Sequence, residues 1–183
     1  ECGIIKRRGT VEANNTVSDY FPVEKEYGYS VFSTVFYAEF LNKKLNVIDC
    51  PGSDDFVGSA ITALNVTDTG VIVVDSQYGV EVGTQNIFRT AEKLNKPIVF
   101  AMNQLDGEKA DFDNVMEQMR ESFGSRVVQV QYPVSSGPSF NAMIDVLLMK
   151  MYSWGPDGGV PTISEIPENE KEKALELNKI LIE

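Results

Sequence analysis

The sequence predicts an α/β fold built around a largely parallel sheet. From residue 45 to residue 132, short apolar runs alternate with segments whose apolar residues recur at helical spacing. Two of these runs end in polar or turn clusters, Asp49-Cys50-Pro51-Gly52 and Asn103-Gln104-Leu105-Asp106. Open α/β sheets place their ligands at the carboxyl ends of strands, so we expect both clusters at one edge of one sheet.

The first half of the chain divides into elements as follows. Residues 1–30 are polar and show no sustained period. Residues 30–40 are β-branched and aromatic, and Asn42-Lys43-Lys44 forms the turn into a strand over 45–49, which predicts an edge hairpin. The spacing then predicts a helix, a strand, a helix and a strand, over residues 56–66, 70–75, 84–94 and 97–102.

The second half continues the alternation and then becomes ambiguous. A helix is predicted over 112–123, ended by Gly124, with a strand over 127–132. Residues 144–151 fit either a helix or a strand. Residues 155–159 break the pattern, and Pro167 opens an acidic helix. We expect a main domain over 1–135 and an appended lobe over 136–183.

The composition excludes several kinds of binding site and catalytic group. The net charge is −11, which argues against a general grip on the nucleic-acid backbone by this segment. The chain has no histidine, which removes histidine acid–base chemistry and histidine metal ligands. Its two cysteines show no metal spacing and fit a reducing cytosol, and no apolar run is long enough for a membrane span. The first residue is not Met, so we expect a piece of a longer protein.

The two polar clusters indicate a guanine-nucleotide site, or what remains of one. An acidic residue followed by a Pro-Gly turn suits a metal-bound phosphate, and Asn-x-x-Asp suits the edge of a purine. The phosphate loop that normally accompanies them, Gly-x-x-x-x-Gly-Lys-Ser/Thr, is missing, because no glycine in the chain is followed by lysine.

These residues resemble the G domain of elongation factor G, a translational GTPase. Asp49-Cys50-Pro51-Gly52-Ser53-Asp54-Asp55-Phe56 is similar to the family's Asp-Thr-Pro-Gly-His-x-Asp-Phe, and Asn103–Asp106 is similar to Asn-Lys-x-Asp. Residues 15–19 and 28–31 resemble its switch I region, and residues 79–84 its Gly-Val-x-x-x-Thr turn. The resemblance implies an incomplete, three-layer P-loop-NTPase-like G domain, divergent and lacking the P-loop. Residues 136–183 then begin the inserted subdomain.

The resemblance also implies ligands for the intact parent protein, namely GTP or GDP and Mg²⁺, which this chain is not expected to bind by itself. Asp49 and Ser30 stand at magnesium-binding positions. The remaining GTP-binding positions are Cys50, Pro51, Gly52, Ser53, Asn103, Gln104, Leu105 and Asp106.

Several function-bearing positions depart from the family pattern. Ser53 stands where the family has the histidine that positions the attacking water, and Asp54 adds a negative charge beside it. Gln104 replaces a lysine, and Tyr27 replaces an arginine before Gly28. No catalytic residue is therefore assigned, and whether the protein is an active GTPase stays open.

Three functions are compatible with the sequence. The first is the GTP-binding domain of a cytoplasmic elongation factor G-like protein that acts in ribosomal translocation. The second is a ribosome-binding module with lost or impaired GTPase activity. The third is an unrelated doubly wound protein of flavodoxin or receiver type, which the sequence disfavours, since the acidic pair and the later lysine of a receiver domain are missing. The expected partners are guanine nucleotide and, through the parent, the ribosome, with neither a membrane nor a specific nucleic-acid sequence bound by this segment.

Overall fold

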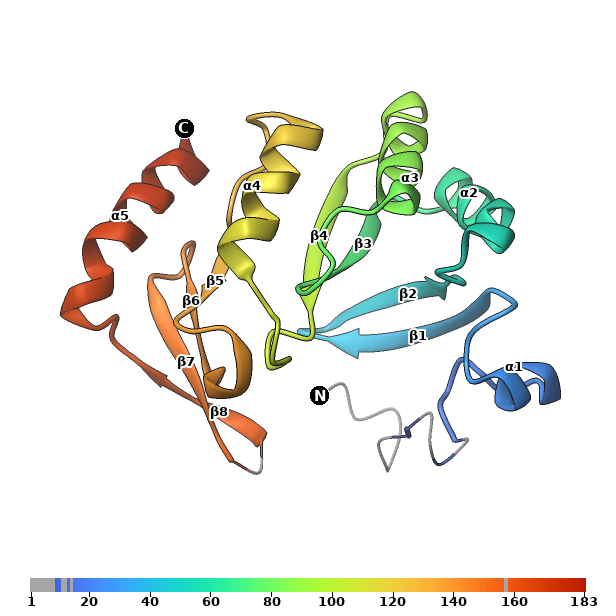
Figure 1. Ribbon diagram of the computed structural model, residues 1–183, viewed down its shortest axis with the longest axis horizontal. Coiled ribbons are helices and arrows are strands. Elements are labelled where there is room, and N and C mark those ends of the chain that lie inside the picture. The colour runs from blue at the N-terminus through green and yellow to red at the C-terminus, as the bar shows by residue number, and fades with distance from the viewer. Residues whose placement is uncertain (1–8, 11–12, 14, 157) are drawn as a thin grey trace. The chain divides into compact units, whose positions relative to one another are not determined.

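The computed structural model describes residues 9, 10, 13, 15–156 and 158–183 (Figure 1). Helices and strands alternate through the first two thirds, and strands then dominate until the final helix. The elements in chain order are α1 (Pro22–Tyr27), β1 (Thr34–Phe40), β2 (Lys43–Asp49), η1 (Asp54–Phe56), α2 (Val57–Val66), β3 (Gly70–Asp75), α3 (Val82–Lys93), β4 (Ile98–Asn103), α4 (Phe112–Phe123), β5 (Gln131–Pro133), η2 (Gly137–Ser139), β6 (Ala142–Asp145), β7 (Lys150–Gly155), β8 (Gly158–Ser164) and α5 (Glu168–Ile182).

The described chain forms two compact units. The first takes the residues up to Val71 and Val82–Val99, and the second takes Ile72–Glu81 and Phe100–Glu183. The described strands of the whole chain form three sheets, with orders β1-β2, β3-β4 and β5-β6-β7-β8. The domain boundary that the sequence predicts near residue 135 falls between β5 and β6, and the assignment of 136–183 to an inserted subdomain stays a prediction.

The hairpin of β1 and β2 belongs to the first unit. The strands pair antiparallel from Thr34↔Asp49 to Phe40↔Lys43. The turn consists of Leu41 and Asn42, whose φ angles are 47° and 58°, as a two-residue type I′ turn requires. The hairpin prediction is confirmed, but the turn lies earlier than Asn42-Lys43-Lys44 because both lysines belong to β2.

Leu41 is strained in this turn, because bulky side chains disfavour positive φ while asparagine tolerates it. We expect Leu41→Asn to raise the free energy of unfolding by about 1 kcal/mol in urea titrations. Asn42→Ala, which places a poorly suited residue beside it, should lower that free energy. An equal free energy of unfolding for Leu41→Asn and the unsubstituted chain would contradict the strain argument.

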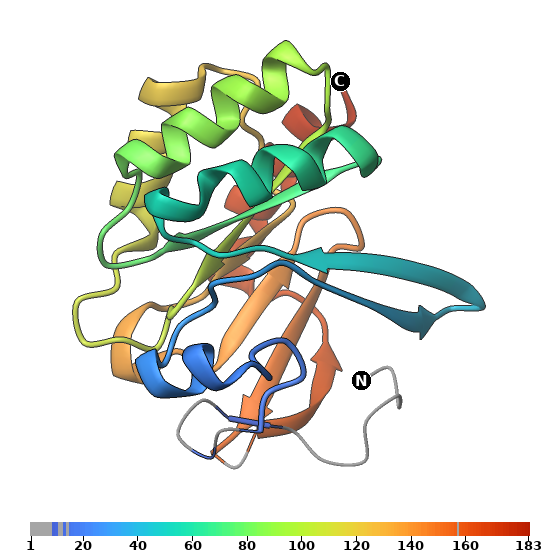
Figure 2. The ribbon, with the colours of Figure 1, turned by 90° about the vertical axis from the view of Figure 1, so that its right-hand side faces the viewer.

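Helices α2 and α3 pack side by side within the first unit (Figure 2). Beyond them, β3 begins beside the start of β4, where Gly70 N–H donates to Pro97 O at 2.9 Å. At the other end of these strands, Ser76 N–H donates to Asn103 O at 3.0 Å. The two bonds join residues with the same offset in sequence, so β3 and β4 run parallel.

The second unit contains the antiparallel sheet β5-β6-β7-β8 and helix α5. Tyr132 of β5 is fully buried, and its hydroxyl donates to a carboxylate oxygen of Glu170 at 3.2 Å. Burial and the neighbouring Glu170 carboxylate raise the pKa of Tyr132 well above its ordinary value. The Lys173 ammonium lies 4.5 Å from the centre of the Tyr132 ring, so α5 is fixed to the sheet by two of its side chains.

The α/β class is confirmed, but strand pairing differs from the prediction of one largely parallel sheet. Asp49 ends a strand of the β1-β2 sheet, and Asn103 ends a strand of the β3-β4 sheet. Among the described strands, β3-β4 is the parallel pair, while the hairpins are antiparallel because their connections are short. Apolar runs identify strands but leave their neighbours undetermined, so the single-sheet expectation was wrong.

Some element predictions also need correction. The strand expected over 127–132 is reduced to Gln131–Pro133. The ambiguous run 144–151 is neither one helix nor one strand, since β6 ends at Asp145 and β7 begins at Lys150. Asp145 accepts Leu148 N–H at 2.7 Å and so closes the turn between them. Helix α1 and strand β8 were not predicted.

Within the described residues, none of the helices combines the length and the apolar character needed to cross a membrane. Helix α4 has a single apolar face. Its apolar residues recur on one face and are all buried, namely Phe112, Val115, Met116, Met119 and Phe123. The Asp111 side chain caps its amino end by accepting Asn114 N–H at 3.1 Å, and Gly124 ends it as predicted.

Candidate nucleotide site

The cluster after β2 forms a turn that leads into η1. Asp49 is half-buried at the end of the strand, Pro51 is buried, and Gly52 and Ser53 are exposed. The Ser53 hydroxyl caps η1 by accepting Asp55 N–H at 3.4 Å. The turn therefore exposes Gly52, the residue whose backbone the resemblance assigns to phosphate, while Ser53 serves as a local cap.

Asp54 lies against the first turn of α3 within the same unit. A Cβ on Gly83 would stand 2.7 Å from Asp54 Oδ1, so the absence of a side chain at Gly83 makes room for this carboxylate. The amino end of a helix attracts negative charge, which gives Asp54 a structural role in addition to its charge beside Ser53.

Ser30, at a predicted magnesium position, has a carboxylate partner in the described structure. Its hydroxyl donates to Asp19 Oδ1 at 2.7 Å. A second bond, from the Thr34 hydroxyl to Ser18 O at 2.9 Å, fixes the same stretch to the start of β1. Because Ser30 donates only its proton to Asp19, the lone pairs of its hydroxyl oxygen stay available to a cation.

Glu24 organises the segment around Ser30. Its side chain is 1% exposed, and its two carboxylate oxygens accept the backbone N–H groups of Phe21, Val31 and Phe32 at 3.1, 3.1 and 3.0 Å. Burial by itself raises the pKa of Glu24, but the three N–H groups outweigh it and hold the pKa below its ordinary value. Sequence patterns do not reveal this carboxylate, because glutamate in a short polar segment usually faces solvent.

The cluster after β4 forms a separate loop in the second unit. Asn103, Gln104 and Asp106 are exposed, and Leu105 between them is buried. Gln104 has a φ of 57°, which turns the backbone so that Leu105 points inward. The loop therefore anchors itself through one apolar side chain and leaves the amide and carboxylate that suit a purine edge accessible to a ligand.

Backbone and hydroxyl groups from other segments support this loop. The buried Ser76 hydroxyl donates to Gln104 O at 2.7 Å, and Gly107 N–H donates to the same oxygen at 3.0 Å. Gly137 N–H donates to Leu105 O at 2.8 Å. The sequence did not predict these supports, since a serine after a strand carries no signature of a distant hydrogen bond.

The predicted site residues thus gather into two groups. Ser30 and Asp49–Ser53 belong to the first compact unit, and Asn103–Asp106 belong to the second. The loop 103–106 fits a guanine base by the chemistry of its exposed groups. For magnesium the fit is incomplete, because the described part of the chain holds no cluster of three or more acidic, histidine or cysteine ligands.

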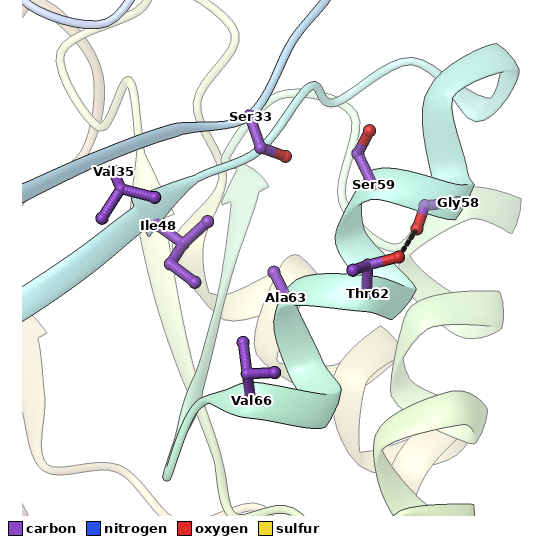
Figure 3. Close-up of a pocket in the computed structure, with 8 residues that line it drawn as sticks. All are labelled: Ser33, Val35, Ile48, Gly58, Ser59, Thr62, Ala63 and Val66. Atoms are coloured by element: carbon purple, nitrogen blue, oxygen red, sulfur yellow. Dashed lines mark hydrogen bonds between the residues drawn. The ribbon is translucent and has the colours of Figure 1, made fainter.

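A cavity of about 420 Å³ lies in the first unit between the β1-β2 hairpin and α2 (Figure 3). Its lining carries no charged side chain and none of the predicted nucleotide-binding residues, so it does not extend the candidate site. Thr62 uses its hydroxyl locally, donating to Gly58 O at 2.8 Å. The lining residues are Ser33, Val35, Ile48, Gly58, Ser59, Thr62, Ala63 and Val66.

Comparisons with known proteins agree with the two motifs. The family model of the elongation factor Tu GTP binding domain matches residues 1–176. An elongation factor G-like protein of Thermotoga maritima is 32% identical over 98% of this chain and 26% of its own length. Elongation factor G of Thermotoga petrophila is 35% identical over 91% of this chain and 24% of its own length.

A solved structure is also similar. A crystal structure of a protein from Thermus thermophilus matches with a TM-score of 0.88 and 29% identity, covering 97% of this chain and 26% of that one. The chain therefore spans about a quarter of the length of the relatives it matches. The matched residues include both strand-end clusters, the resemblance to elongation factor G is confirmed, and the chain belongs to the family of elongation factor Tu GTP-binding domains.

Proposed function

We propose that this chain is part of the G domain of a cytoplasmic elongation factor G-like protein, in which guanine-nucleotide binding and GTP hydrolysis are coupled to translocation on the ribosome. The observation that carries the proposal is the loop after β4. It presents Asn103 and Asp106 to solvent while Leu105, Ser76 and Gly137 hold its backbone. A loop whose backbone is held by hydrogen bonds and whose amide and carboxylate are exposed suits recognition of a base edge.

Asp106 is proposed to accept hydrogen bonds from the N1–H and the 2-amino group of guanine, and Asn103 to contact the edge of the same ring. Gln104 replaces a lysine whose stem would cover the base, and its shorter stem offers apolar contact without charge. Leu105 supports the loop from beneath. A site that hydrogen-bonds these groups rejects bases that lack them, so adenine nucleotides should bind poorly.

Asp49 and Ser30 are proposed to hold magnesium, and the backbone of Cys50, Pro51, Gly52 and Ser53 to face the terminal phosphate. Magnesium, when bound, neutralises charge on the phosphate groups. Ser30 would keep its hydrogen bond to Asp19 and offer a lone pair of the same oxygen to the cation.

Base recognition is tested in the parent protein by reversing the chemistry of Asp106. Asparagine at this position offers an N–H donor, which matches the 2-oxo group of xanthine in place of the 2-amino group of guanine. We expect Asp106→Asn to weaken GDP binding about 100-fold and to strengthen binding of xanthosine diphosphate. The control is Asp113→Asn, which makes the same change at an exposed aspartate outside the loop and should leave GDP binding unchanged. A parent protein that binds ADP as tightly as GDP would refute the proposal.

This chain by itself should bind GDP very weakly or not at all. The phosphate loop normally supplies backbone N–H donors and a lysine to the phosphates, and the sequence has no Gly-Lys pair. We expect calorimetric titration of the 183-residue chain to give no micromolar dissociation constant for GDP, while the parent protein does bind. Micromolar binding by this chain would show that the residues present are sufficient.

A second function, a ribosome-binding module with impaired GTPase activity, is favoured by Ser53. This residue replaces the histidine that positions water, and its hydroxyl caps η1. The two functions share nucleotide binding and the ribosome as partner, and they differ in the rate of hydrolysis by the parent.

A further inference from the structure

We propose that Ser76 is a positioning residue for base recognition, holding the loop 103–106 in the conformation that reads guanine. The inference rests on the proposed function, since it concerns the nucleotide specificity of that loop. Ser76 directly follows β3 and is distant in sequence from the loop. Nothing in the family motifs singles it out, and only the folded structure brings it to Gln104.

Ser76 makes three hydrogen bonds, all within the second unit. Its N–H donates to Asn103 O at 3.0 Å, and its hydroxyl donates to Gln104 O at 2.7 Å. Its carbonyl accepts Asp111 N–H at 2.9 Å, which joins it to the residue that caps α4. Ser76 thus joins the end of β3 to the loop through its hydroxyl and its N–H. Its carbonyl joins the same point to the cap of α4, the helix that follows the loop.

The hydroxyl bond falls where the backbone is most constrained. Gln104 adopts a φ of 57°, a conformation that residues other than glycine and asparagine rarely adopt. Its carbonyl accepts both the Ser76 hydroxyl and Gly107 N–H. These two donors offset the strain, and without the hydroxyl the carbonyl keeps one of them.

The hydroxyl itself has no alternative partner in water, because Ser76 is 0% exposed. A buried hydroxyl is stable in a protein only while it is hydrogen-bonded, so the interaction with Gln104 is maintained without nucleotide. Asn103 and Asp106 flank this anchored peptide, and the loop is therefore preorganised before the base arrives.

Preorganisation should appear as discrimination between bases. Hypoxanthine keeps N1–H but lacks the 2-amino group, so the preference for GDP over inosine diphosphate reports how well Asp106 is placed. If the loop relaxes, the contact with the amino group is weakened first, and the preference falls even where total binding persists. Loss of one hydrogen bond of ordinary strength corresponds to a change of about tenfold.

The experiment compares Ser76→Ala and Ser76→Cys with the unchanged sequence. Ser76→Cys keeps a weak donor of similar shape and should restore part of the effect. Val115→Ala is the matched control, because it removes buried methyl groups of α4 in the same unit and lowers stability without touching the loop. Two readouts are taken: amide hydrogen exchange at Gly107 in this chain, and the ratio of GDP to inosine diphosphate affinity in the parent.

In Ser76→Ala we expect exchange at Gly107 to rise about tenfold and the affinity ratio to fall about tenfold, with Ser76→Cys between the two. Val115→Ala should leave the affinity ratio unchanged. An unchanged ratio and unchanged Gly107 exchange in Ser76→Ala would overturn the inference, as would an equal fall of the ratio in Val115→Ala. If the unsubstituted parent protein shows no preference for GDP over inosine diphosphate, the proposed function is refuted instead. The exchange rates at Gly107 would then still decide whether Ser76 holds the loop.

Discussion

Replacing Ser53 with histidine in the parent protein should raise ribosome-stimulated GTP hydrolysis by about 100-fold in single-turnover assays. Phosphoryl transfer depends on positioning and electrostatics, and an imidazole reaches a water molecule that the shorter serine side chain cannot orient. In the described structure the Ser53 hydroxyl caps η1 through Asp55 N–H, which directs it toward its own turn.

Ser53→Ala provides the control, and it should hydrolyse GTP as slowly as the unchanged protein. If the unchanged protein already matches a histidine-containing elongation factor G, and neither substitution alters the rate, another group positions the water. That outcome would favour the fully active translation factor over the module with impaired hydrolysis, without affecting the family assignment.

Glu24→Ala is expected to lower the free energy of unfolding by about 3 kcal/mol, because three backbone N–H groups lose a charged acceptor. The comparison is Glu26→Ala, an exposed glutamate on the same helix, which should change stability by less than about 0.5 kcal/mol. Urea unfolding measures both, and amide exchange at Val31 and Phe32 shows whether the loss is local. Equal effects of the two substitutions would contradict the role assigned to Glu24.

The pKa of Glu24 gives this prediction a pH window. Its folded-state pKa lies below the ordinary value of 4.5. The carboxylate therefore contributes its full stability above pH 4.5 and loses it as the pH falls through the lower, folded-state pKa. Glu24→Gln keeps an acceptor oxygen, but its amide does not titrate. The unfolding free energy of this variant should therefore vary less with pH in this acidic range than that of the unsubstituted chain.

Local sequence patterns predicted those elements that local interactions determine. Helix α4 agrees with its prediction because its apolar face, the Asp111 cap and Gly124 all specify the same bounds. Helix α1 was missed because six residues provide too few turns to show a period, and because Glu24 bonds Val31 and Phe32 beyond the end of the helix, which no helical pattern reveals. Strand β8 was missed because its glycines and proline argue against a strand, whereas pairing with β7 stabilises it.

The candidate site likewise has features that local sequence shows and features that only the folded structure shows. The strand-end clusters were visible because Asp49 and Asn103 follow apolar runs, and their chemistry suggested a nucleotide. The supports of the loop, Ser76 and Gly137, could not be predicted because their hydrogen bonds join them to residues that are distant in sequence. The roles of Asp49, Ser30 and the other nucleotide-binding positions remain predictions.

The exposed apolar rows of the strands also affect how the chain behaves in concentrated solution. On β3, Val71 and Val73 are 63% and 61% exposed, and β3 pairs with β4 within the described sheet. Such open apolar rows and free strand edges promote self-association, in which one molecule adds its strands to another. The net charge of −11 opposes that encounter at neutral pH. Acidification toward the isoelectric point near pH 4.5 removes this protection, so solubility is lowest at the pH where the stabilising contribution of Glu24 begins to decline, although its folded-state carboxylate is still charged there.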